Sequence, residues 1–159
     1  MSRDHSTGTD GNETTLGRIE TEVALLMRLG EATRRATGTA EHRVLDRAAY
    51  VILRHLDKAG AQNVSALAAR LNLDGSTVTR QVSAMQRDGL ITRAPDPADG
   101  RGTVVSATPA GLQRMAAVRA ARTRLYGDIL ADWTGDDRDT LATMLHRLNQ
   151  ALESRNKRR

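Results

Sequence analysis

The sequence changes its hydrophobic pattern at Gly89. Before this point, apolar residues recur at the three- and four-residue spacing of amphipathic helices, which predicts helices at about 16–37, 46–59, 64–71 and 75–88. After it, LITRA and GTVVSAT are short, rich in β-branched residues and separated by the turn PDPADGR, which predicts a β-hairpin. Two further helices are expected, from Pro109 to about Leu130 and after the break WTGDDRDT. Short helix, turn, helix and hairpin is the order of a winged helix-turn-helix.

Capping residues support these boundaries. Asp46, Asp74 and Thr108 are expected to cap the helices that follow them, and Gly60 is expected to end the second helix. Ser65 is the expected cap of the third helix, and either Thr134 or Asp136 that of the last. The predicted fold is therefore mainly α with a small β-hairpin wing.

The helix that follows Asp74 carries an unusual set of small polar residues. Its core side is expected to be formed by Val78, Val82 and Met85, which leaves the hydroxyl residues and Arg80 on the other side. In a helix-turn-helix, the start of this second helix meets base edges in the major groove. Hydroxyls can bond to phosphates or bases, and Arg80 is long enough to reach guanine O6 and N7. We therefore predict DNA contacts by Ser76, Thr77, Thr79, Arg80 and Ser83; Arg87 is either a phosphate contact or a solvated charge.

Charge and composition narrow the classes of function. The net charge is +5, but three Arg and one Lys in the last five residues, RNKRR, carry most of it, so charge alone is a weak signal for DNA. With no Phe, one Trp and two Tyr, the chain is poor in the aromatic residues that stack on single-stranded nucleic acids. No cysteine is present, which excludes disulfides and thiol chemistry.

Several motifs in order resemble the MarR family of bacterial transcriptional regulators. They are Ser76 to Arg80, Gly89-Leu90, Pro95 to Arg101, and Ala107-Thr108 with Gly111. The resemblance implies a MarR-type domain over 16–154, with a DNA-binding winged-helix lobe at about 46–108 and dimerisation helices at about 16–37 and 109–154. Residues 1–15 are expected to be disordered and 155–159 to form a basic tail.

The resemblance also assigns roles in the wing. Arg101 would enter the minor groove, where narrow A·T-rich stretches attract an arginine, and Asp99 would orient it. The alternative is a solvated pair of loop charges worth at most about 1 kcal/mol. The chain departs from the family pattern at Gly75, Gly100 and Gly102, where many relatives carry larger residues. Fewer phosphate contacts and a more flexible wing are expected as a result.

A homodimer on a pseudo-palindromic operator is the assembly that the resemblance implies. The first and last helices carry apolar stripes, which independently call for a partner surface. Family members commonly release DNA when a small lipophilic or aromatic anion binds. Residues expected to line such an effector pocket, or else to be ordinary core, are Val23, Met27, Tyr50, Arg54 and Met115.

Other classes of function have less support. The sequence has no phosphate-binding Gly-rich loop and no nucleophile elbow, and its four His are scattered, so neither an enzyme, a metal site nor a cofactor is expected. A low-specificity architectural DNA-binding protein is the alternative to a regulator, although such proteins rely on Lys and Arg more than on hydroxyls. No membrane span or secretory signal is recognised, and a cytoplasmic location is expected.

Overall fold

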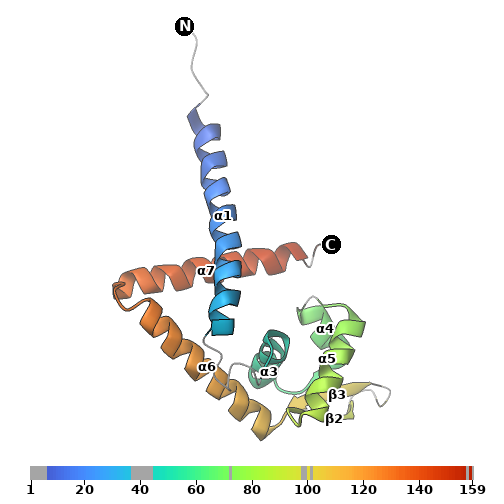
Figure 1. The fold of residues 1–159 in the computed structure, drawn as a ribbon. Coiled ribbons are helices and arrows are strands. Elements are labelled where there is room, and N and C mark those ends of the chain that lie inside the picture. Colours follow the sequence, from blue (N-terminus) through green and yellow to red (C-terminus); the bar gives the residue numbers. More distant parts are fainter. Residues whose placement is uncertain are drawn as a thin grey trace. The chain divides into compact units, whose positions relative to one another are not determined.

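The protein is described by a computed structural model that covers residues 7–36, 45–71, 73–97, 100, 102–156 and 158. The chain divides into two compact units, Met1–His42 and Arg43–Arg159. The first unit contains α1 (Thr7–Ala36), and the second contains the remaining helices and strands of the described residues (Figure 1). These elements confirm the predicted class, which is mainly helical with a small antiparallel sheet.

Helix α1 begins earlier than the sequence pattern predicts. It starts at Thr7, so the prediction of disorder is wrong for residues 7–15; residues 1–6 lie outside the described part of the chain. Extending an existing helix requires far less free energy than nucleating one, and a Thr or Gly lowers the helix propensity by no more than about 1 kcal/mol. The apolar periodicity that predicts a helix from Leu16 therefore does not set its first residue.

The helix-turn-helix lies in the second unit. It consists of α3 (Arg47–Ala59), α4 (Val64–Leu71) and α5 (Gly75–Arg87). The predicted caps Asp46 and Asp74 are confirmed, because each carboxylate accepts the backbone N–H three residues later at 2.7 Å. Gly60, with φ of 76°, ends α3 as predicted. Ser65 is not the cap of α4, however; it lies inside the helix.

The sheet has three strands in the order β1-β3-β2. The predicted hairpin is formed by β2 (Ile91–Pro95) and β3 (Thr103–Ala107), which pair antiparallel with Arg93 opposite Val105. The short strand β1 (Gln62–Asn63) pairs with the other edge of β3. A strand of this length carries no alternating pattern, which is why the sequence does not reveal it.

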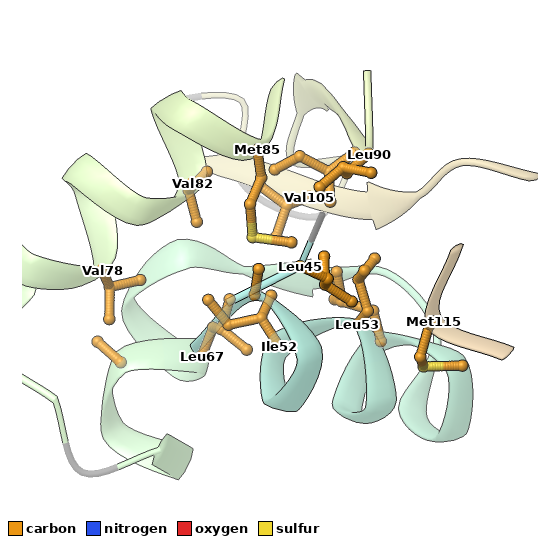
Figure 2. Packing of buried hydrophobic residues seen from close by; sticks show 14 of the residues in the cluster. Leu45, Ile52, Leu53, Leu67, Val78, Val82, Met85, Leu90, Val105 and Met115 are labelled. Atoms are coloured by element: carbon orange, nitrogen blue, oxygen red, sulfur yellow. The ribbon is translucent and has the colours of Figure 1, made fainter. Parts of the chain in front are cut away.

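The core of the second unit joins the helix-turn-helix to the hairpin. Figure 2 shows Val82 and Met85 of α5, Val105 of β3 and residues of α3 pointing into a common interior. Val78, Val82 and Met85 are at most 1% exposed, which confirms the predicted core side of α5. The same packing directs the opposite side of α5 away from the core.

The helices α6 (Pro109–Ile129) and α7 (Gly135–Asn156) complete the second unit. Thr108 caps α6 as predicted, and its hydroxyl also donates to the carbonyl of Gly89 at 2.7 Å. Thr134 caps α7, since its hydroxyl oxygen accepts the N–H of Asp137 at 3.1 Å. Helix α7 extends to Asn156 and so includes the first two residues of the predicted basic tail. Among the described helices, none has the length and apolar character needed to cross a membrane.

Candidate nucleic-acid interface

The outward side of α5 brings the predicted DNA-contacting residues of this helix together. At 100° per residue, Ser76, Arg80, Ser83 and Arg87 form one stripe, because they recur at intervals of four, three and four positions. All of them are exposed, as is Thr79 beside the stripe, whereas Thr77 on its other flank is half-buried. The six predicted residues of α5 therefore share one accessible surface.

Hydroxyl groups in the first turn of α5 bind Asp74. The Ser76 hydroxyl donates to Asp74 Oδ1 and the Thr77 hydroxyl to Oδ2, both at 2.5 Å. Together with the backbone N–H of Thr77, these bonds lower the pKa of the Asp74 carboxyl far below its usual range, with the Ser76 bond as the largest cause. Asp74 is therefore ionised at neutral pH, and both hydroxyls already have a partner in the free protein.

The side chains of Thr79 and Arg80 do not bind Asp74 in this way. Within the part of the chain that the structure describes, the Arg80 guanidinium forms no hydrogen bond or ion pair, and neither does the Thr79 hydroxyl. A free guanidinium on an exposed helix stripe keeps all five of its N–H donors available. It can therefore offer two parallel donors to a guanine edge or to a phosphate.

Ser83 links α5 to the wing. Its hydroxyl donates to the carbonyl of Thr79 at 2.8 Å and accepts from Arg93 Nη2 on β2 at 3.0 Å. Arg93 is half-buried, and its Nε has no hydrogen-bond partner in the described structure. The Ser83–Arg93 bond is a long-range contact that no local sequence pattern predicts.

The base of the wing is organised by Asn63. Its side-chain carbonyl accepts the N–H of Ser65 at 2.9 Å and so caps α4, which is the role that sequence reasoning gives to Ser65. Its amide group donates to Asp96 Oδ2 at 3.3 Å. A Cβ at Gly102 would lie 2.8 Å from Asn63 Nδ2, so the glycine at this departure from the family pattern leaves room for that contact. Asp99 and Arg101, the predicted wing contacts, lie outside the described residues.

Predicted effector-pocket residues are divided between the two units. Val23 is half-buried and Met27 is 68% exposed in α1, whereas Tyr50 and Arg54 lie in α3. Met115 is 6% exposed and belongs to the core of the second unit. Sequence reasoning missed Arg122 of α6, whose guanidinium lies 4.5 Å from the centre of the Tyr50 ring.

A separate shallow pocket of about 450 Å³ lies between α3 and α4. Its lining includes three basic side chains and no carboxylate; the residues are His55, Lys58, Ala59, Gln62, Ala66 and Arg70. Burial is the main cause of a lowered pKa for His55, and the charges of Arg70 and Lys58 lower it further. Among the described residues, no group of three or more His, Asp or Glu side chains could hold a metal ion.

Comparison with known proteins identifies the family. The MarR family model matches residues 45–103, which span the helix-turn-helix and β2 and end at the first residue of β3. The HTH-type transcriptional regulator YxaD of Bacillus subtilis is 35% identical over 108 residues, which cover 68% of this chain and 76% of that protein. The chain belongs to the MarR family. Members of this family are DNA-binding regulators of transcription and not enzymes.

Two further relatives bear on fold and function. The HTH-type transcriptional repressor IacR of Pseudomonas putida is 30% identical over 109 residues, covering 69% of this chain and 61% of that protein. The PcaV transcriptional regulator of Streptomyces coelicolor, solved in complex with its natural ligand, has a similar fold with a TM-score of 0.65. It is 22% identical, and the match covers 96% of this chain and 99% of that one. The MarR-type winged-helix fold is therefore established for the chain.

Proposed function

We propose that this MarR-family protein is a transcriptional repressor that binds a pseudo-palindromic operator as a homodimer and leaves it when a small molecule binds. The observation that carries the proposal is the free Arg80 guanidinium on the exposed stripe of α5. In a helix-turn-helix this stripe faces the major groove. The name of the relative IacR supports repression rather than activation.

Residues of α5 divide between base and backbone contacts in this proposal. Arg80 reads a guanine and Thr79 beside it touches a base edge or a thymine methyl group. Ser76, Thr77, Ser83 and Arg87 complete the contact surface, with Arg87 placed for a phosphate at the far end of the helix. In the wing, Arg101 enters the minor groove and Asp99 orients it.

A second copy of the chain is the proposed partner of α7. This helix has no buried residue among those described, although Leu141, Leu145, Leu148 and Leu152 recur along it at the spacing of a helix-helix seam. Leu148 and Leu152 are 38% and 50% exposed. Helix α1 also exposes apolar side chains, including Leu16, Ile19 and Leu26. Apolar stripes of this kind favour association over exposure to water.

The proposed effector is a small lipophilic or aromatic anion. The structure of PcaV with its natural ligand supports a ligand-binding role by family analogy. In this chain Tyr50 and Arg54 of α3 offer an aromatic surface and a positive charge, and Arg122 adds a second charge beside Tyr50. Met115 of the same unit supplies an apolar contact in this proposal, and the roles of Val23 and Met27 of the first unit stay predictions. A ligand releases DNA only if it binds the DNA-free conformation more tightly.

Selection of bound duplexes from a random DNA pool, followed by affinity measurements in a salt series, tests the proposal. A two-fold symmetric consensus, bound by two chains at least about 10³-fold more tightly than random duplex, is the expected result. Uniform affinity for all duplexes with a steep salt slope would overturn it in favour of an architectural protein.

Three substitutions sharpen the test. Arg80→Ala should weaken operator binding by about 1–3 kcal/mol and relax base preference at one position of each half-site. Arg119→Ala removes the same charge from the exposed surface of α6 and should leave base preference unchanged. Leu148→Glu should convert the dimer to monomers in sedimentation experiments, and a dimer that survives this change would place the interface elsewhere.

A further inference from the structure

The first turn of α5 has an unusual hydrogen-bond arrangement for a surface that meets DNA. The Asp74 carboxylate accepts three hydrogen bonds, from the Ser76 hydroxyl, the Thr77 hydroxyl and the Thr77 backbone N–H. Asp74 and Ser76 are exposed and Thr77 is half-buried, so the group lies at the surface. The carboxylate and both hydroxyls are therefore within reach of a molecule that approaches the start of the helix.

Chemistry decides the direction of the two hydroxyl bonds. An ionised carboxylate has no proton and can only accept. Each hydroxyl has a single proton, and in both Ser76 and Thr77 that proton points at Asp74. What remains on the outer side of each hydroxyl oxygen is a lone pair. The first turn of α5 thus offers acceptors alone from the side chains of Asp74, Ser76 and Thr77.

Bases and phosphates respond differently to such a surface. In the major groove the donors are the amino groups of cytosine N4 and adenine N6, whereas guanine O6, thymine O4 and the purine N7 atoms are acceptors. Phosphate oxygens are acceptors as well. An acceptor surface therefore gains hydrogen bonds from amino groups and is repelled by the keto bases and by phosphate.

We infer that the Asp74, Ser76 and Thr77 side chains form an acceptor patch that selects operator positions at which the contacted strand carries cytosine or adenine. The inference deepens the proposed operator binding and rests on it. Every base pair has one amino group in the major groove, so the patch distinguishes the strand that carries it rather than G·C from A·T. Arg80, one turn further along α5, has donors only and so complements the patch.

The substitution Asp74→Asn tests the patch while keeping the helix cap, because Asn caps helices as well as Asp. The amide oxygen can still accept from the Thr77 N–H and the Ser76 hydroxyl. The amide nitrogen then replaces Oδ2 beside the Thr77 hydroxyl and donates to it, which turns the Thr77 proton outward. Selected duplexes for the wild type should show C or A at the contacted position, and those for the variant should lose this preference or change to G or T.

Base analogues provide a direct measurement. Purine in place of adenine, or pyrimidin-2-one in place of cytosine, removes the amino group from the selected duplex. Either change should weaken wild-type binding by about 3-fold to 10-fold and should affect the Asp74→Asn variant much less. Asp128→Asn is the matched control, because it makes the same change of charge on the exposed surface of α6, away from the stripe of α5; it should retain the amino preference at the patch position.

The outcomes separate this inference from the proposed function. If the wild type selects a symmetric operator but Asp74→Asn, folded as judged by its thermal unfolding, selects the same bases, the acceptor patch is refuted and operator binding stands. The patch is likewise refuted if the amino-free analogues bind as tightly as the natural bases. If the wild type selects no consensus at all, the proposed function fails and the inference fails with it.

Discussion

The side-chain amide of Gln81 donates hydrogen bonds to both carboxylate oxygens of Asp46, at 3.2 and 3.0 Å. The same carboxylate accepts the N–H of Ala49 at 2.7 Å and thereby caps α3. One side chain thus begins α3 and holds the middle of α5, 35 positions later in the chain. The orientation of the exposed stripe of α5 therefore depends in part on Asp46, which is not a member of the stripe.

Loss of Asp46 should destabilise the second unit more than loss of Gln81. Asp46→Ala removes an N-cap and a partner of Gln81, and we expect the free energy of unfolding to fall by about 1–2 kcal/mol. Gln81→Ala removes only the bond between helices, for which about 0.5–1.5 kcal/mol is expected. Urea unfolding of both variants and of the double variant measures the coupling. Strictly additive effects would mean that the Gln81–Asp46 bond contributes nothing to stability.

The Ser83–Arg93 bond should show the difference between losing the acceptor of a surface hydrogen bond and removing a side chain whose buried Nε has no partner. Ser83→Ala removes the partner of Arg93 Nη2 at the surface, beside a buried Nε that already lacks one, and should lower stability by about 0.5–1.5 kcal/mol. Arg93→Met keeps an unbranched apolar chain but removes the unsatisfied Nε together with Nη2, so a smaller loss or a gain is expected.

The double variant Ser83→Ala with Arg93→Met provides the control for this prediction. It should be more stable than Ser83→Ala alone, because no stranded guanidinium remains. Thermal unfolding at several denaturant concentrations makes the comparison. If the double variant is less stable than either single one, packing of the Arg93 side chain rather than its hydrogen bond stabilises the contact between α5 and β2.

Sequence reasoning succeeded where the physical cause is local. Asp46, Asp74 and Thr108 were predictable caps because a cap acts on a backbone N–H three residues away. The buried face of α5 was predictable for the same reason, since its period reflects the helix alone. That the Arg80 guanidinium forms no hydrogen bond or ion pair with the described residues could not be predicted from a local pattern. Its role in DNA binding stays a prediction.

The contacts that sequence reasoning missed are partly distant and partly local. Asn63 directly precedes α4 and takes the capping role expected of Ser65 through a bond to a residue two positions later, whereas its bond to Asp96 joins parts of the chain 33 positions apart. The bonds of Ser76 and Thr77 to Asp74 are local, yet sequence reasoning treated these hydroxyls as free contacts for phosphates or bases. A Ser or Thr two or three residues after an N-cap Asp is a signal that could have revealed their engagement.

Gly111 should tolerate no side chain. A Cβ at this position would lie 2.2 Å from the carbonyl oxygen of Leu90, and that oxygen accepts the Thr108 N–H at 3.0 Å, so backbone would have to shift. Gly111→Ala is expected to lower stability by about 3 kcal/mol, at the upper end for overpacking. Gly127→Ala in the same helix is the matched control, because no atom lies within 4 Å of its Cβ; it should raise stability by about 0.5–1 kcal/mol. Equal effects of the two changes on the denaturation midpoint would contradict the close approach of α6 to Leu90.

Stability of the second unit should fall as pH decreases through the range in which an ordinary histidine gains a proton. Burial, and then the charges of Arg70 and Lys58, lower the folded-state pKa of His55 below its ordinary value of 6.5. In this pH range the unfolded chain therefore binds more protons than the folded chain, and the free energy of unfolding decreases with decreasing pH. His55→Gln should flatten the dependence of the free energy of unfolding on pH between about pH 7.5 and 5.5, as measured by urea unfolding at fixed ionic strength.

Arg70→Gln should flatten this pH dependence only in part, because burial is the larger cause of the lowered pKa of His55. A His55→Gln variant that retains the full slope would show that other groups produce it.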